Sequence, residues 1–329
     1  MKAIVVGAGL SGAVSAFILK AKGFDVEVFE SRRHMAGNCF DYHKQNMIIH
    51  KYGPHTFHTN NKKIWSFVNK FATFKSYCHI VEANTKEGRI PIPFNKKSEE
   101  ILGKKTSDQI IDLVFKDYSE KMWGANWEDI PASTKARVAK TKDSYDACYH
   151  KDIYQALPEQ GYTFFVKNML DGVMVNLDVD KNCWRKQKAD LIIYTGKLDE
   201  YFDYSHGFLG YRSLDIKMSE AKRQKCLQVN ECNKFKKYTR TIDFSFLNNK
   251  LLKNGNTTIS REYPCEHTIR NTPFYPKNLP QDKEKLKIYK RMAKSEKGVV
   301  FTGRLATYKY LDMDAAIGQA LSKLEKVNG

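Results

Sequence analysis

The sequence predicts an α/β fold divided into two or three lobes. The first observation is a β-branched run at residues 2–6 that leads into Gly7 to Gly12 and then into helical spacing at 13–22. The second is another β-branched run at 25–29 that ends in an acidic residue. The third is the length of 329 residues, which exceeds what one small hydrophobic core usually organises.

The order of these first elements is informative by itself. Strand, Gly-x-Gly-x-x-Gly, helix, strand and acid follow one another as in a Rossmann-like dinucleotide-binding unit. In such a unit Gly7 permits a tight turn, Gly9 lets the backbone approach a diphosphate, and Gly12 lets the helix pack closely on the strand. The helix N-terminus, near Leu10 and Ser11, offers N–H groups and partial positive charge to phosphates.

The segment after the second strand distinguishes between dinucleotides. Glu30 can accept hydrogen bonds from both hydroxyls of a ribose, which disfavours a 2′-phosphate and therefore NADP. The run from Glu30 through two arginines to Gly37 and Asn38 is common in flavoproteins with two dinucleotide-binding motifs, and it favours FAD over NAD. The residues of this run that we expect to contact the cofactor are Glu30, Ser31, Arg32, Gly37 and Asn38.

Composition narrows the class of partner. The chain has 55 Lys and Arg against 37 Asp and Glu, a net charge of +18 that favours anionic ligands such as a nucleotide or a phosphorylated substrate. It shows neither zinc-finger spacing nor the aromatic and basic signature of RNA-recognition modules, so we expect no nucleic-acid partner. No apolar run approaches the roughly 20 residues that span a bilayer, and the N-terminus lacks a signal-peptide pattern. These features predict a cytoplasmic protein without membrane insertion, and residues 283–297 predict a solvated helix face.

Cysteine and histidine patterns predict neither cross-links nor metal. The seven cysteines are an odd number, widely scattered and without a Cys-x-x-Cys pair, so reduced thiols are the simpler interpretation. His55 and His58 have the i, i+3 spacing of a metal pair, but no third ligand is evident. We therefore predict no metal site.

From residue 51 onward the sequence resembles one family in particular. The run Lys51 to Asn60, Lys-Tyr-Gly-Pro-His-Thr-Phe-His-Thr-Asn, closely resembles the flavin-face segment of the UDP-galactopyranose mutases. Further motifs resemble that family in the same order, and they are Tyr118 to Gly124, Gly161-Tyr162, Tyr194 to Gly196, Tyr201 to Tyr204, Tyr211 to Ser213, Tyr238 to Arg240, Arg261 to Pro264, Pro273 to Pro276 and Gly303 to Met313. On these motifs the sequence is identified as a member of the family.

The resemblance implies an activity. It implies an FAD enzyme that interconverts UDP-galactopyranose and UDP-galactofuranose without net redox change, for the biosynthesis of galactofuranose in cell-surface polysaccharide. It implies that the flavin is reduced, with NAD(P)H as the external reductant, and that flavin N5 attacks the anomeric carbon as UDP leaves. The adduct then opens as an iminium and recloses through the other hydroxyl. Two alternatives stay open: a mutase for a related UDP-sugar such as UDP-N-acetylgalactosamine, and an FAD oxidoreductase of the amine-oxidase type.

The resemblance also assigns residues to the substrate. Arg137 and Arg240 match the family's two diphosphate-binding arginines, because a guanidinium offers forked donors to the charge on a departing nucleotide. The other residues that it assigns to substrate binding are Phe115, Tyr118, Trp123, Tyr149, Arg212, Tyr275 and Tyr310. By helical spacing alone, Phe115 and Tyr118 would instead belong to the core.

On the flavin side the resemblance assigns His55, Thr56, Arg304, Asp312 and Met313. His55 is expected nearest the sugar and Arg304 at the flavin phosphate. Asp312 precedes a helical pattern and is expected to cap it, with the positive end of that helix toward the flavin. The residues expected to act in catalysis are Arg137, Arg240, His55, Tyr310 and Asp312.

The family's organisation completes the expected fold, which is α/β (α+β overall). A discontinuous Rossmann-like FAD-binding domain is expected from residues 1–74, 151–199 and 276–329. Residues 75–96 and 200–275 are expected to form an antiparallel-sheet substrate domain. Residues 97–150 are expected to form a small helical domain with a mobile loop.

Three departures from the family pattern stand out. The helical part is shorter than in bacterial relatives, where it builds the dimer, so either a homodimer or a monomer is possible. Cys78 stands where the family often has Asn near the substrate, and Val114 replaces an aromatic that packs the nucleoside. These changes bear on affinity and sugar choice rather than on the fold.

Overall fold

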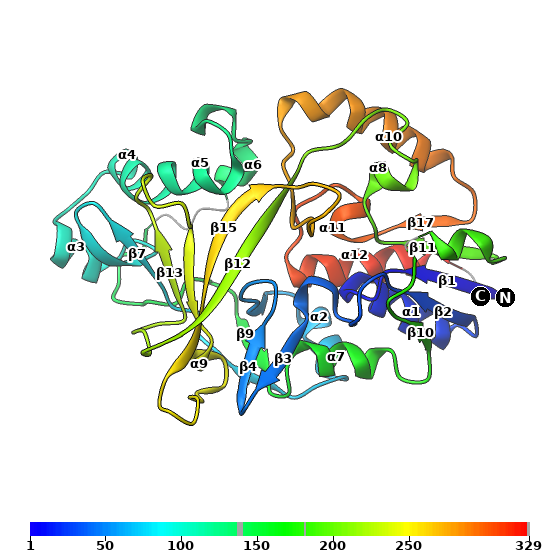
Figure 1. The fold of residues 1–329 in the computed structure, drawn as a ribbon, viewed down its shortest axis with the longest axis horizontal. Helices are drawn as coiled ribbons and strands as arrows, with labels where there is room; N and C mark the ends of the chain where they lie inside the picture. The colour runs from blue at the N-terminus through cyan, green and yellow to red at the C-terminus, as the bar shows by residue number, and fades with distance from the viewer. Residues whose placement is uncertain (137–140, 181, 328–329) are drawn as a thin grey trace.

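Two β-sheets and a group of short helices follow one another along the long axis of the molecule (Figure 1). The computed structural model describes residues 1–136, 141–180 and 182–327, so Arg137 lies outside the described residues. A five-stranded parallel sheet occupies one end, a seven-stranded mixed sheet the middle, and helices α3 to α6 the other end. The parallel sheet has the order β10-β2-β1-β11-β17, with β1 (Lys2–Val6), β2 (Asp25–Phe29), β10 (Met174–Asn176), β11 (Leu191–Tyr194) and β17 (Val299–Phe301).

The parallel sheet is built from short runs rich in β-branched residues, and its central strands β1 and β11 contain the fully buried side chains of Ile4, Val5 and Ile193. Helix α1 (Leu10–Ala21) packs against α12 (Met313–Glu325), and both cover the sheet. The fully buried side chains Val5, Val14, Ile193 and Ile317 belong to this core. The strand–helix–strand prediction is confirmed. The helix begins at Leu10, inside the glycine motif and before the helical pattern that starts at residue 13. Glycine can take part in this first turn because the turn depends on backbone N–H groups and not on side chains.

The mixed sheet has the order β16-β12-β15-β14-β13-β7-β8. Its strands are β7 (Val81–Thr85), β8 (Gly88–Ile92), β12 (Tyr211–Ala221), β13 (Gln228–Glu231), β14 (Arg240–Asp243), β15 (Thr257–Glu266) and β16 (Tyr275–Pro276). It is antiparallel as expected except between β7 and β13, which pair in parallel. The two strands are far apart in the sequence, so no hairpin turn sets their relative direction.

The helices at the far end pack on β7 and β8. Their bounds are α3 (Lys96–Leu102), α4 (Ser107–Ile110), a π-helical stretch (Ile111–Lys116), α5 (Asp117–Trp123) and α6 (Ala132–Lys135). The side chains of Asn95 and Thr106 begin α3 and α4 with capping boxes. Leu113, Val114 and Phe115 are buried against the sheet. We therefore propose that the division expected from the sequence, with the helical part at 97–150, holds for this chain.

The remaining elements connect or cover the sheets. They are β3 (Asp41–Lys44), β4 (Met47–His50), β5 (Phe57–Thr59), β6 (Phe74–Ser76), β9 (Tyr154–Pro158), α2 (Lys62–Val68), α7 (Tyr162–Met169), α8 (Leu198–Tyr201), α9 (Ser245–Asn248), α10 (Lys283–Ser295) and α11 (Gly303–Ala306), with 3-10 turns at Gly37–Cys39, Trp127–Asp129, Cys183–Lys186 and Pro280–Asp282. Helix α10 buries Tyr289 and exposes most of its lysines, as its charge pattern predicts. None of the helices described in this chain has both the length and the apolar composition that crossing a bilayer requires.

One prediction about cysteine is wrong. Cys78 and Cys148 form a disulfide, with their Cα atoms 5.3 Å apart, whereas the sequence suggested that all cysteines are reduced. A β-bridge between Ile80 and Cys148 brings the two segments together. The backbone N–H of Tyr149 also donates to the carbonyl of His79 at 2.7 Å. Sequence spacing could not show this pair because the cysteines are 70 residues apart and meet only through tertiary structure.

The cross-link should contribute measurably to stability. We expect Cys78→Ser to lower the free energy of unfolding by about 2 to 4 kcal/mol, because the disulfide restricts the unfolded chain. Urea unfolding of the wild type with and without dithiothreitol measures the effect, and the reduced wild type should unfold like the variant. Cys183→Ser is the control, since Cys183 is a free thiol. A wild-type midpoint that is unchanged by dithiothreitol would contradict the prediction.

Candidate functional site

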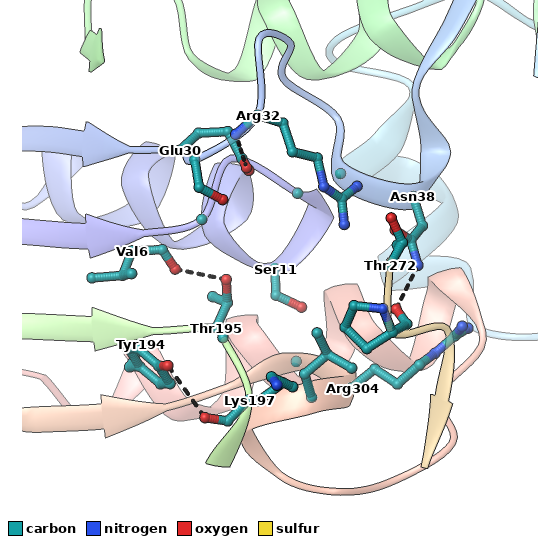
Figure 2. Close-up of a pocket in the computed structure, with 18 of the residues that line it drawn as sticks. Val6, Ser11, Glu30, Arg32, Asn38, Tyr194, Thr195, Lys197, Thr272 and Arg304 are labelled. Carbon is teal, nitrogen blue, oxygen red and sulfur yellow. Dashed lines mark hydrogen bonds between the residues drawn. The ribbon is translucent and has the colours of Figure 1, made fainter. Parts of the chain in front are cut away.

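A cavity of about 420 Å³ lies at the carboxyl ends of β1, β2, β11 and β17 (Figure 2). In open parallel sheets this edge is where dinucleotides bind. The predicted cofactor residues that line it are Gly7, Gly9, Leu10, Ser11, Glu30, Ser31, Arg32, Gly37, Asn38, His55, Arg304, Asp312 and Met313. Gly12 and Thr56 do not line this cavity.

The glycines act through close approach of backbone. Gly7 has φ +102°, and a Cβ there would lie 2.2 Å from Thr195 Oγ1. A Cβ on Gly12 would lie 1.9 Å from the carbonyl oxygen of Gly7, so the first turn of α1 rests directly on the end of β1. Gly9 is different, because the nearest atom to its Cβ would be the Cα of Gly37 at 3.7 Å. Side-chain atoms at Gly9 would therefore occupy space beside the cavity rather than clash with the fold.

The segment that follows β2 brings polar groups to the cavity, two of which have no hydrogen-bond partner among the described residues. The carboxylate of Glu30 accepts the N–H groups of Ala8 (3.0 Å) and Arg32 (2.9 Å), which fixes it at the end of β2. Arg32 Nη1 and Asn38 Oδ1 are buried and have no hydrogen-bond partner among the described residues. Buried polar atoms without partners are costly and rare. A bound dinucleotide would satisfy them, so the residues present fit an FAD.

The other end of the cavity carries an uncharged histidine. The ring Nδ1 of His55 lies 2.9 Å from the carbonyl oxygen of Gly53. The backbone N–H of His55 donates to Nδ1 of His50 at 3.0 Å. Burial, together with the nearby His50 and Arg304, lowers the pKa of His55 to about 3. Because a carbonyl can only accept, Nδ1 carries the proton, and Nε2 is left with a lone pair.

Asp312 precedes α12 and lines the cavity, but the prediction about its side chain is wrong. Asp312 occupies the N-cap position, and within the described residues its side chain makes no capping hydrogen bond. The carboxylate of Asp314 instead accepts the N–H of Ala315 at 2.6 Å.

Arg240 is a fixed cation next to this end of the cavity. Arg240 is the first residue of β14, and it pairs with the fully buried Glu262 on the neighbouring strand β15. Its Nε and Nη2 lie 2.7 and 2.6 Å from Oε2 of Glu262. Burial opposes the charge, but Glu262, Tyr118 and Tyr275 raise the pKa of Arg240 well above its usual value. Arg240 and Arg304 both act electrostatically on His55, which links the cavity to this group.

Aromatic rings surround the arginines. Tyr275 and Tyr310 stack with centroids 5.2 Å apart, and the edge of Trp123 contacts both rings at 6.0 and 6.3 Å. The guanidinium of Arg304 lies over both tyrosines, at 5.3 Å from Tyr275 and 4.9 Å from Tyr310. Burial raises the pKa of Tyr118, so its hydroxyl stays neutral beside Arg240.

Arg304 lines the cavity, and its expected role at the flavin phosphate stays a prediction. Its Nη2 donates to the carbonyl of Leu311 at 2.6 Å, and its Nη1 donates to the carbonyl of Phe274 at 3.1 Å. These bonds hold the guanidinium over Tyr275 and Tyr310. Figure 2 shows the side chain of Arg304 pointing away from Ser11 and the glycine motif.

Two expected substrate residues have contacts that are mainly structural. Arg212 is buried, donates to the carbonyls of Lys121 (3.0 Å) and Met122 (2.8 Å), and pairs with Glu266 at 2.6 Å. It therefore holds the C-terminal end of α5 on the sheet. Phe115 is 5% exposed and belongs to the core under the helices.

Two residues at this site were missed by sequence reasoning. One is Glu262, which holds Arg240. It belongs to the motif from Arg261 to Pro264, but the resemblance assigned it no role. The other is His79, which is 6% exposed and packs its ring against the edge of Tyr149 at 6.0 Å. Burial and Arg240 lower the pKa of His79 to about 4.

The environment of His79 defines its tautomer. Gln228 Nε2 donates to Asn230 at 2.8 Å, so Gln228 Oε1 accepts from His79. His79 Nδ1 has no partner among the described residues, so this bond uses Nε2–H and leaves Nδ1 as a buried acceptor beside Arg240. No sequence pattern marks this histidine.

His58 does not join His55. Its Nδ1 lies 2.8 Å from Oδ2 of Asp152, and its ring stacks on His150 at 3.6 Å with a 16° angle between the planes. The three residues place possible ligand atoms within 4.8 Å of one another. However, lone pairs of two stacked imidazoles lie in separate planes and cannot meet at one ion, so the absence of metal stays our prediction.

Buried neutral histidines should make stability depend on pH. Burial lowers the pKa of His50 to about 3 and that of His79 to about 4, against 6.5 when unfolded. Below about pH 6.5 these histidines become protonated in the unfolded state but stay neutral in the native state. The free energy of unfolding therefore falls as the pH falls below about 6.5, and it does not change with the titration of these groups at higher pH. We expect a loss of about 2 to 3 kcal/mol between pH 7.5 and 5.5 from these two groups.

Urea midpoints at the two pH values measure this loss. His50→Gln should reduce the pH dependence, whereas the exposed His43→Gln should not. Equal midpoints at both pH values would show that the two imidazoles are not buried as neutral groups.

The parallel sheet and its glycine-lined cavity define a dinucleotide-binding α/β protein. In agreement, residues 5–71 match the family model of the NAD(P)-binding Rossmann-like domain. Residues 113–310, more than half of the chain, match the model of UDP-galactopyranose mutase. The chain belongs to the UDP-galactopyranose mutase family.

Individual relatives match over nearly the whole chain. The dTDP-fucopyranose mutase of Escherichia coli is 29% identical, and the alignment covers 97% of this chain and 96% of that protein. The probable UDP-galactopyranose mutase of Klebsiella pneumoniae is 28% identical, covering 98% and 94%. A crystal structure of reduced UDP-galactopyranose mutase superposes with a TM-score of 0.77 at 12% identity, covering 98% of this chain and 93% of that one.

Proposed function

We propose that the protein is an FAD-dependent, redox-neutral isomerase that converts UDP-galactopyranose to UDP-galactofuranose. The observation that carries the proposal is Arg240, a partly buried guanidinium held by the fully buried Glu262 near Tyr118 and Tyr275, next to the end of the dinucleotide cavity that contains His55. Family membership supports the same reaction class. We further propose that the protein acts in the cytoplasm, in the supply of galactofuranose for cell-surface polysaccharide, with NAD(P)H as reductant.

When bound in its reduced form, FAD would supply an electron-rich N5 that bonds transiently to the anomeric carbon and holds the sugar while its ring opens and recloses. The protein's contribution is to hold both fragments. Arg240 would bind the diphosphate as charge grows on the departing nucleotide, and Arg137, which lies outside the described residues, is its proposed partner. The ion pair of Arg240 with Glu262 holds the Arg240 guanidinium in place before the nucleotide leaves.

His55 would act as a hydrogen-bond acceptor through its ring Nε2. Its neutral ring presents Nε2 as an acceptor at the flavin end, so it can accept a hydrogen bond from a donor on the cofactor or the sugar. Tyr275 and Tyr310, with Trp123 behind them, would exclude water and align the sugar near this atom. Asp312 and Met313, at the N-terminal end of α12, would contact the flavin.

The substrate could carry another nucleotide and sugar, because the dTDP-fucopyranose mutase is as similar to this chain as the probable UDP-galactopyranose mutase. A dTDP-sugar lacks the ribose 2′-hydroxyl. We therefore treat dTDP-fucopyranose as the second candidate, and UDP-N-acetylgalactosamine as a further sugar to test.

Product analysis tests the proposal. The purified holoenzyme is reduced with dithionite and incubated with each of the three nucleotide sugars, and the products are separated chromatographically. We expect conversion of UDP-galactopyranose by the reduced enzyme and none by the oxidised one. Net reduction of oxidised flavin by a substrate would instead indicate an oxidoreductase, and faster conversion of dTDP-fucopyranose would favour the second candidate.

A further inference from the structure

Lys197 lies just beyond the carboxyl end of β11, where no sequence motif predicts a cofactor contact. Thr195 Oγ1 donates to the carbonyl of Val6 at 2.7 Å, which holds the chain after β11 against the end of β1. Lys197 follows two residues later and lines the cavity. Figure 2 shows it across the cavity from Glu30 and Arg32, with Ser11 of the α1 N-terminus between them.

The ammonium of Lys197 is almost completely enclosed. The residue is 7% exposed, and its Nζ lies 3.1 Å from the Tyr204 hydroxyl and 3.2 Å from His267 Nε2. Both groups are uncharged at neutral pH, because burial raises the pKa of Tyr204 and, together with Lys197, lowers that of His267. Lysine is rarely buried to this extent, since removing its charge from water is costly.

Two carboxylates lie on α8, the short helix that follows Lys197. Asp199 is 1% exposed, and burial raises its pKa while Lys197 opposes that shift. Glu200 lines the cavity itself. An anionic ligand entering beside Glu200 would meet repulsion unless a cation lay between them, and Lys197 is the lysine on this wall of the cavity.

Arg304, the other basic residue on this side of the cavity, binds groups at the opposite end. Arg304 donates to the carbonyls of Leu311 and Phe274 and lies over two tyrosines, so its guanidinium serves the opposite end of the cavity. On the β2 side Arg32 offers a buried, unpaired Nη1. Because β2 and β11 flank β1 in the sheet, Arg32 and Lys197 approach the N-terminus of α1 from opposite sides.

We propose that Lys197 is a binding residue for the cofactor's diphosphate, with Arg32 as its counterpart on the other wall and the N-terminus of α1 between them. A diphosphate carries two negative charges, and two cations and a helix terminus would neutralise them. The inference rests on the proposed FAD cofactor. It explains why a lysine is enclosed in a wall that otherwise consists of aromatic, polar and acidic groups.

The test measures cofactor release and does not depend on turnover. Purified holoenzyme is diluted in series, and the fluorescence of released FAD gives the dissociation constant at several salt concentrations. Lys197→Met keeps the length of the side chain and removes its charge, and we expect FAD affinity to fall about 10- to 100-fold at low salt. The difference from wild type should shrink as salt rises, because salt screens the lost attraction. Lys197→Arg should retain most of the affinity.

Two variants separate this role from a purely structural one. Tyr204→Phe removes the hydroxyl contact but leaves the ammonium, so its affinity should stay within about threefold of wild type. Lys287→Met, on the exposed face of α10, controls for net charge and should also leave affinity unchanged. A salt-independent loss of equal size in Lys197→Met and Tyr204→Phe, or unchanged affinity in Lys197→Met, would overturn the inference alone. A wild type that binds no FAD would overturn the proposed function as well.

Discussion

Replacing Arg240 by alanine is expected to lower kcat by about 100- to 1,000-fold, because the variant loses a preorganised donor for the charge on the departing nucleotide. Bound FAD should be retained, since Arg240 does not line the dinucleotide cavity. Arg240→Lys should recover part of the rate, because an ammonium restores the charge but not the forked geometry. Steady-state kinetics of the reduced enzyme, with flavin absorbance to confirm FAD content, measure both effects.

Stability must be controlled in this experiment, because Arg240→Ala leaves Glu262 as a fully buried carboxylate without its cation. The double variant Arg240→Ala with Glu262→Gln removes that penalty and should be equally slow but more stable in urea. Arg261→Ala is the matched control, because Arg261 is an exposed arginine on the adjoining strand and should change kcat less than twofold. A rate within threefold of wild type for the FAD-loaded Arg240→Ala variant would reject the assigned role.

Two alanine substitutions in the glycine motif are expected to fail in different ways. A Cβ on Gly12 would lie 1.9 Å from the carbonyl oxygen of Gly7, and because both atoms are backbone-bound, α1 must move away from β1. We expect Gly12→Ala to destabilise the protein by about 3 kcal/mol or more and to yield little soluble, FAD-loaded enzyme.

Gly9→Ala should leave the fold intact, because its Cβ would meet no atom closer than 3.7 Å. It should nevertheless weaken FAD by about 1 to 3 kcal/mol, since the methyl group would keep the diphosphate from the N–H groups of α1. Urea unfolding and FAD dissociation of both variants measure the contrast. Full cofactor affinity in Gly9→Ala would show that the diphosphate does not approach this glycine.

Local sequence was enough to predict the cofactor half of the molecule. The β1–α1–β2 unit and the acid Glu30 depend on short-range features, namely β-branched runs, glycines and a terminal carboxylate, and the structure contains them at the expected positions. The cavity at the end of this unit contains nearly every residue that the motif and the resemblance assigned to it.

Features that depend on contacts between distant parts of the chain could not be predicted from the sequence. The orientation of Arg304 is set by two carbonyls from separate segments, Leu311 and Phe274, and no motif records such a choice. His79 Nδ1 is left as a buried acceptor only because Gln228, from a strand far away in the sequence, accepts the hydrogen bond from the ring N–H. Lys197 was overlooked because an isolated lysine in a chain with 55 basic residues carries no signal until its burial is known.

The disulfide has a consequence for how such a chain can diversify. Cys78 and Cys148 pin both ends of a 70-residue excursion, which contains α3 to α6, at one spot on the mixed sheet. Extra residues inserted in the connections between α3 and α6, after β7 and β8, would lengthen this part without straining the sheet or the dinucleotide cavity, because loop extension costs little once the ends are fixed. The helical appendage is therefore a natural point for evolutionary growth, or for grafting a foreign module by an engineer.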